Sequence, residues 1–131
     1  MATAREANFK RGIALFNQAR FFDAHEALED AWRETHGEPR LFLQGLVQVA
    51  VAMHHYRGGN FTGARGVLAR ALRNLAPYAS GYEGIDLRSL RRQLHPILAR
   101  AEAGQPMPAA LPTIRKVRRK PPARKRNATA K

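Results

Sequence analysis

The segment 39–56 constrains the fold most, because apolar side chains occur on nearly every face of the helix that it would form. A helix that is apolar all round, in a chain of this kind, lies at the centre of a bundle and is covered by other helices. Its apolar run is shorter than the ~20 residues that a membrane span needs. The run is interrupted by four polar residues: Gln44, Gln48, His54 and His55. We therefore expect a buried central helix and no transmembrane segment.

Apolar periodicity and end signals predict four further helices around it, at 5–18, 23–35, 60–77 and after Asp86. Asp23, Asn60 and Asp86 stand where helix-capping side chains are expected. Pro96 is expected to kink the last helix or to delay its start. The sequence thus predicts an all-α fold, a compact bundle of about five helices.

A short pattern recurs at an offset of 40 residues. Ala19-Arg20-Phe21 and Gly59-Asn60-Phe61 each precede a helix of alternating small and large apolar residues. Such a pattern is typical of helical-hairpin repeats like the tetratricopeptide repeat, although that repeat has a period of ~34 residues. Because a solenoid needs three or more repeats, we interpret the recurring pattern as two related helical hairpins in one globule.

The net charge of +13 is concentrated at the C-terminus. Residues 115–131 hold nine Lys and Arg and no acid, whereas residues 1–114 hold fourteen basic and ten acidic residues. Several prolines break any helix beyond Gly104, and high charge with few apolar side chains disfavours an ordered structure. We expect one helical domain over 1–104 and a disordered, Pro-rich basic tail over 105–131.

The absence of cysteine excludes disulfides and thiolate metal sites. The N-terminus lacks the apolar stretch of a signal peptide. Both observations fit a cytoplasmic protein, which is the localisation that we expect.

Polar residues at helical spacing form the main candidate site. His25, Glu29 and Trp32 share one face of the helix 23–35. Gln44, Gln48 and His55 share an arc of the helix 39–56, and His54 lies ~100° from His55. If the two helices pack antiparallel, these groups converge, and buried polar groups require partners.

Such a cluster allows three interpretations. His25, Glu29 and His54 could hold a divalent metal with an open position, as in a metal-assisted hydrolase, or Glu29 could orient His25 as a general base. The cluster could instead line a small-ligand pocket. It could also be a structural network in which the Trp32 indole N–H is bonded. Because the HExxH motif of zinc proteases is absent, we favour the structural interpretation and a protein that is not an enzyme.

Three separated motifs resemble a known family. They are F-x-A-H-E-x-L-E-x-x-W over 22–32, L-Q-G-L-x-Q-x-A-x-x-x-H-H over 43–55, and G-N-x-x-G-A over 59–64, with Asp23 in the first variable position. In this order they resemble the small all-helical domain-of-unknown-function family 309, over roughly residues 5–80. The resemblance implies a compact helical bundle and no established activity. It implies these signature residues: His25, Glu26, Glu29, Trp32, Gln44, Gly45, His54 and Asn60. It thereby favours His54 over His55 as the cluster's imidazole, and it adds Glu26, which helical geometry directs to solvent.

The basic tail suggests a further function, as an accessory protein that contacts nucleic acid or another polyanion. Its cations could neutralise phosphates in a salt-dependent and sequence-independent way. Base stacking is not expected, because the tail has no aromatic residue. The alternative is a solvated terminus without a partner. The candidate contacts are Arg115, Lys116, Arg118, Arg119, Lys120, Arg124, Lys125 and Arg126.

Overall fold

Five α-helices account for most of the computed structural model, which describes residues 2–117. They are α1 (Ala4–Asn17), α2 (Phe21–Arg33), α3 (Pro39–Arg57), α4 (Phe61–Leu75) and α5 (Leu87–Glu102), with a short 3-10 helix η1 (Tyr82–Gly84) before α5. The predicted all-α fold is confirmed. None of the helices between residues 2 and 117 combines the length and the apolar character that crossing a membrane would require.

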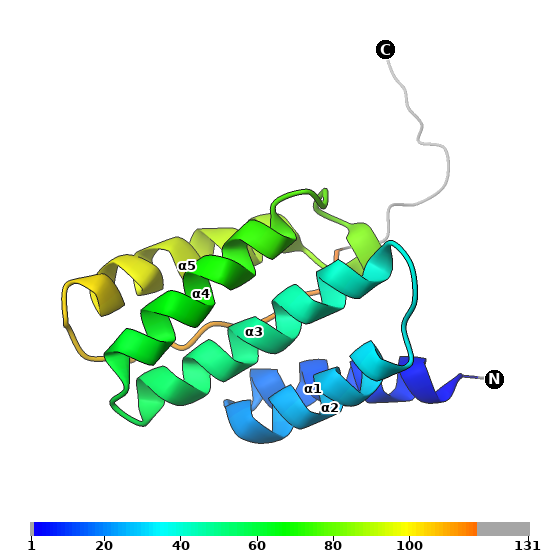
Figure 1. Cartoon of the computed structure of the whole chain (residues 1–131), viewed down its shortest axis with the longest axis horizontal. Helices are drawn as coiled ribbons and strands as arrows, with labels where there is room; N and C mark the ends of the chain where they lie inside the picture. Colours follow the sequence, from blue (N-terminus) through cyan, green and yellow to red (C-terminus); the bar gives the residue numbers. More distant parts are fainter. Residues whose placement is uncertain (1, 118–131) are drawn as a thin grey trace, which may run out of the picture.

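The helices pack in two layers (Figure 1). α2, α3 and α4 lie side by side in one layer, and α1 and α5 lie behind its two edges. The closest packing is within the pairs α1/α2 and α3/α4, and α3 also packs against α2. Residues 105–117 return as an extended segment behind α3.

The two helix pairs turn in the same way. Ala19 and Gly59 both have left-handed backbone conformations, with φ of 63° and 86°. The amide of Arg20 donates to the carbonyl of Leu15, and 40 positions later the amide of Asn60 donates to the carbonyl of His55. This six-to-one bond closes the end of each first helix. The predicted pair of related hairpins is therefore confirmed.

Most helix ends follow the sequence signals. The side chains of Asn60 and Asp86 accept bonds from the amides of Gly63 and Ser89, so both expected caps form. α2 begins at Phe21, two residues before the expected start, and Asp23 lies in its first turn. Pro96 lies inside α5 and neither delays its start nor ends it.

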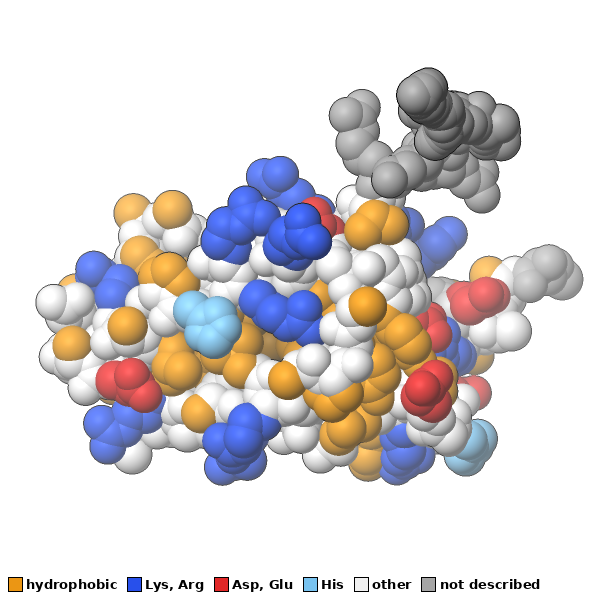
Figure 2. Space-filling view, turned by 90° about the horizontal axis from the view of Figure 1, so that it is seen from above, with side chains coloured by type: hydrophobic (Ala, Val, Ile, Leu, Met, Phe, Trp, Pro, Cys, Tyr) orange, Lys and Arg blue, Asp and Glu red, His pale blue; other side chains and the backbone are white. Residues whose placement is uncertain are grey.

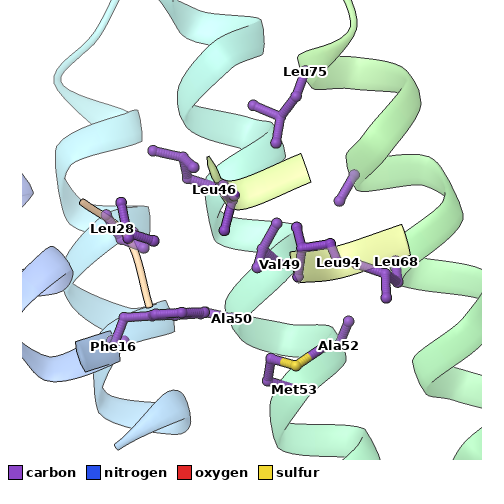
Figure 3. Packing of buried hydrophobic residues seen from close by; sticks show 14 of the residues in the cluster. Phe16, Leu28, Leu46, Val49, Ala50, Ala52, Met53, Leu68, Leu75 and Leu94 are labelled. Atoms are coloured by element: carbon purple, nitrogen blue, oxygen red, sulfur yellow. The ribbon is translucent and has the colours of Figure 1, made fainter. Parts of the chain in front are cut away.

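The core is centred on α3, as expected (Figure 3). Each of the other helices contributes buried apolar side chains to it. At Gly45, an added Cβ would lie 2.7 Å from the Leu75 side chain, and at Gly12 it would lie 2.6 Å from Leu28. These two glycines therefore let α4 and α2 approach their neighbours closely.

The packed part of the chain extends beyond the expected boundary at residue 104. Ile114 is 1% exposed and belongs to the core. The Asn17 side chain donates to the carbonyl of Ile114 and accepts from its amide, at 2.9 and 2.7 Å. The Gln93 side chain forms the same pair of hydrogen bonds with the backbone of Thr113, at 3.0 and 2.9 Å. The prediction of disorder from residue 105 therefore fails for 105–117, because two amide side chains satisfy the backbone of an extended segment.

Candidate functional site

The predicted polar cluster lies at the surface of α2 and α3 rather than in the core. His54 and Gln44 are exposed. The side chains of His25 and Glu29 are 23% and 35% exposed, and His25 Nε2 lies 3.6 Å from Glu29 Oε1. Glu26 is exposed, in the direction that helical geometry indicated. The expectation of a buried network is therefore wrong for these residues.

Two of the imidazoles, those of His25 and His54, lie next to the same exposed aromatic ring, that of Phe22. The Phe22 ring is 5.6 Å from that of His25 and 5.3 Å from that of His54, between ring centroids. The His55 ring is 6.2 Å from that of His54. Among residues 2–117, no three His, Asp or Glu side chains are grouped so that they could hold a metal. The proposed ligand set of His25, Glu29 and His54 is thus not assembled.

The remaining members of the cluster have other partners. Gln48 accepts a hydrogen bond from Asn74 of α4 at 2.8 Å, and so it faces away from α2. The guanidinium carbon of Arg40 lies 3.9 Å from the Trp32 ring centroid, in a cation–π contact. The indole N–H of Trp32 is buried and has no acceptor within the described residues, contrary to the expected bond. The predicted polar cluster is therefore a series of separate local contacts on α2, α3 and α4.

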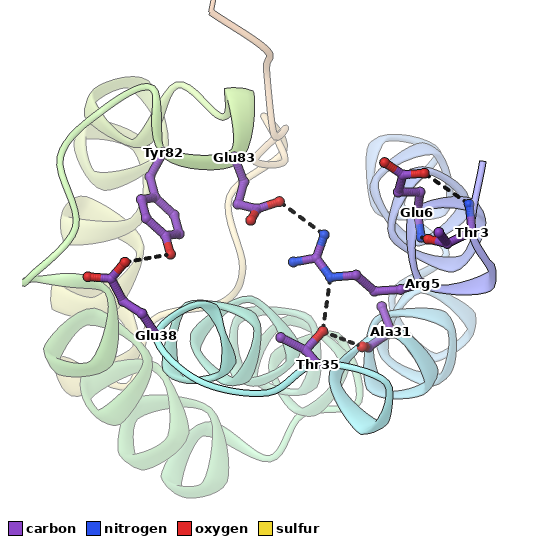
Figure 4. A network of polar contacts seen from close by, with 8 residues as sticks. All are labelled: Thr3, Arg5, Glu6, Ala31, Thr35, Glu38, Tyr82 and Glu83. Atoms are coloured by element: carbon purple, nitrogen blue, oxygen red, sulfur yellow. Dashed lines mark hydrogen bonds and ion pairs between the residues drawn. The ribbon is translucent and has the colours of Figure 1, made fainter. Parts of the chain in front are cut away.

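A partly buried polar network lies elsewhere, where the start of α1 meets the end of α2 (Figure 4). Thr35 donates to the carbonyl of Ala31 at 2.7 Å and accepts from Arg5 Nε at 3.0 Å. Arg5 also pairs with Glu83 of η1 at 3.1 Å. Nearby, burial and the Glu38 carboxylate raise the pKa of Tyr82. These contacts join α1, α2 and η1, and their satisfied hydrogen bonds indicate a structural role.

Basic side chains are concentrated on α4 and α5. α4 and α5 carry seven arginines and a single acid, Glu102. Figure 2 shows Lys and Arg side chains gathered over this side of the molecule. Each ion pair found within residues 2–117 involves α1 or α2. Five of the arginines are exposed and form no side-chain hydrogen bond in that range: Arg65, Arg70, Arg73, Arg88 and Arg92.

The basic tail begins near two of these arginines, Arg88 and Arg92, at the start of α5. The amide of Asp86 donates to the carbonyl of Arg115 at 2.8 Å, and the amide of Val117 donates to Gly84 at 2.9 Å. The charges of Arg92 and Arg88 both act on the Asp86 carboxylate, whose pKa is lowered chiefly by the bond from the Ser89 amide. Asp86 therefore lies among three exposed arginines, which we call the basic edge: Arg88, Arg92 and Arg115.

The predicted tail contacts are only partly described. Arg115 and Lys116 are exposed, and Lys116 turns toward a groove along α1. The other six predicted contacts, Arg118, Arg119, Lys120, Arg124, Lys125 and Arg126, lie outside the described residues. Arg88 and Arg92 were missed by sequence reasoning, although the absence of any acid between residues 87 and 101 was a signal for them.

Comparison with known proteins supports the family resemblance. The chain is 31% identical over 108 residues to an uncharacterised protein of Aquifex aeolicus, a match covering 81% of this chain and 32% of that protein. It is 34% identical over 68 residues to the uncharacterised protein YpuF of Bacillus subtilis, covering 51% and 39%. The chain thus spans about a third of the length of these relatives. Residues 9–67 match the family described as Domain of unknown function (DUF309), which confirms the resemblance over that segment.

Proposed function

We propose that this protein is a non-enzymatic binding module that holds the phosphate backbone of nucleic acid. The basic edge and the tail that follows it act together. The observation that carries the proposal is the hydrogen bond from the Asp86 amide to Arg115. It places the first cation of the tail beside α5, so that the charge of the tail continues a basic surface of the folded domain.

The charge pattern suits phosphates better than a small ligand. Arg88, Arg92 and Arg115 are exposed, and guanidinium groups bind phosphate oxygens with planar, paired donors. One carboxylate, that of Asp86, lies among them and is engaged in capping α5. The tail beyond residue 117 adds seven more Lys and Arg and no acid. Such a surface predicts binding without base recognition, because phosphate contacts carry no sequence information.

Fluorescence anisotropy with a short labelled duplex DNA tests the proposal. The wild-type chain is expected to bind at low salt. Between about 50 mM and about 200 mM salt its affinity should fall about 10³-fold or more, which corresponds to six or more phosphate contacts. Truncation after Val117 should weaken binding strongly. Arg88→Glu with Arg92→Glu should weaken it in the full-length chain as well.

A matched control separates the basic edge from net charge. Arg11→Glu with Arg33→Glu makes the same change of charge on α1 and α2, at positions outside the groove that Lys116 lines. This control should bind nearly as well as the wild type. The proposal is wrong if the control weakens binding as much as the α5 variant does, or if the wild type does not bind DNA. Tighter binding to anionic lipid vesicles than to DNA would also contradict it.

A further inference from the structure

The outer face of α3 is open to solvent and carries no charge. From Leu41 to Tyr56 this helix has no Lys, Arg, Asp or Glu. No other described segment covers it in Figure 1. Gln44 and His54 are exposed on this face, and Leu41 is 39% exposed. In a chain in which 25% of the residues are charged, an uncharged open face is typical of the centre of a protein interface.

The helices on either side of α3 have opposite charges. α2 contains four acidic residues and one arginine, a net charge of −3. α4 contains three arginines and no acid, a net charge of +3. Across this layer the surface therefore changes from acidic, through uncharged, to basic.

Two contacts fix the register of the three helices. The Phe22 ring lies 5.3 Å from the ring of His54, which sets α2 against α3. The hydrogen bond between Gln48 and Asn74 sets α3 against α4. α2 and α4 both run antiparallel to α3 (Figure 1). Positions on α2 can therefore be matched with positions at the same level on α4.

Acidic residues of α2 and basic residues of α4 lie at similar heights along the axis of α3. With a rise of about 1.5 Å per residue, Glu26 lies within about 3 Å, along the helix axes, of the level of Arg70. Glu29 lies equally close to the level of Arg73. Glu26 and Arg70 thus lie at matching levels on the two helices that flank α3, and so do Glu29 and Arg73.

From this arrangement we infer that a second copy of the chain docks on the α2–α3–α4 face. Its two-fold axis runs parallel to α3. Rotation about such an axis keeps the level of each residue but exchanges the two sides, so that α2 of each copy faces α4 of the other. Glu26 then faces the partner's Arg70, and Glu29 faces the partner's Arg73. A two-fold axis across α3 would instead place like charges together, and such pairs repel.

The face is large enough for a stable dimer. α3 has 19 residues, a length of about 28 Å, and helices pack about 9 Å apart. Three helices therefore offer about 800 Å² per copy, which is the area of a standard protein interface. Arg88 and Arg92 of the basic edge are on α5, which lies behind this layer (Figure 1), so dimer formation leaves the basic edge free.

Sedimentation velocity over a wide range of protein concentration tests the inference on nucleic-acid-free protein. At high concentration the sedimentation coefficient of the wild type should correspond to twice the mass of one chain. Glu26→Arg with Glu29→Arg should weaken the dimer about tenfold or more, and so should Arg70→Glu with Arg73→Glu, since each turns four attractive contacts into repulsive ones. Circular dichroism checks that each variant is folded.

Recombination of the charges gives the decisive result. A mixture of the two reversed variants should form a heterodimer, and a chain with all four reversals should form the homodimer again. Arg88→Glu with Arg92→Glu, on α5, should leave the dimer unchanged. A wild-type chain that stays a single copy at every concentration would overturn the inference. So would reversed variants that dimerise like the wild type, or that do not recover when the charges are recombined.

Discussion

The segment 105–117 should stabilise the folded domain through one buried side chain, that of Ile114. Ile114 is 1% exposed and belongs to the core, and hydrogen bonds join its segment to Asn17 of α1 and Gln93 of α5. Replacing a buried isoleucine with alanine removes apolar contacts and leaves a cavity, which costs about 2–5 kcal/mol. For a domain of this size, 1 kcal/mol lowers Tm by about 4 °C. Ile114→Ala should therefore lower Tm by about 8–20 °C.

Thermal unfolding followed by circular dichroism measures this loss, and Val117→Ala is the matched control. Val117 is apolar and β-branched like Ile114 but is 40% exposed, so the control should change the unfolding free energy by less than about 0.5 kcal/mol. Truncation after Val117 should also keep the wild-type Tm. If Ile114→Ala lowers Tm no more than Val117→Ala does, the segment is not part of the core.

Further predictions concern the surface pair, the close helix contact and a helix cap. His25→Ala should lower the free energy of unfolding, measured in urea, by less than about 1 kcal/mol, since a partly exposed ion pair contributes little. A larger loss would indicate that His25 does belong to a buried network. Gly45→Ala should cost about 1–3 kcal/mol because its Cβ would overlap a core side chain, whereas Gly66→Ala, in open space in α4, should stabilise by about 0.5–1 kcal/mol; equal effects would refute the close contact. The bond from Ser89 lowers the pKa of Asp86 in the folded state, so its contribution to stability is present above about pH 4 and is lost as the pH falls. Asp86→Asn should therefore show a smaller loss of Tm on acidification than the wild type, and an equal loss would contradict the assignment.

The helices of this fold follow from local sequence signals. The apolar positions of α3 predict a central helix, and Asn60 and Asp86 mark the starts of α4 and α5. The repeated turn at Ala19 and Gly59 is visible as a repeated motif. These features depend on residues within a few positions of each other, and so a single sequence can indicate them.

The candidate site could not be predicted in the same way. Helical geometry placed His25 and Glu29 on one face correctly, but whether that face is buried depends on how α2 packs against α3. Gln48 was assigned toward α2 and binds α4 instead. The sequence did not indicate that residues 105–117 are ordered, because their order depends on hydrogen bonds from the distant side chains of Asn17 and Gln93. Such contacts join residues far apart in the chain, and composition does not report them.

The salt dependence of DNA binding by the chain truncated after Val117 separates the folded domain from the tail. We infer that the folded domain itself contacts phosphates through Arg88, Arg92 and Arg115. The truncated chain should therefore still bind duplex DNA at low salt, with a slope of log K against log salt of about −2 to −3. Arg88→Glu with Arg92→Glu should bring this slope close to zero. If the truncated chain does not bind, or if its slope is unchanged by that double substitution, the folded domain has no part in binding.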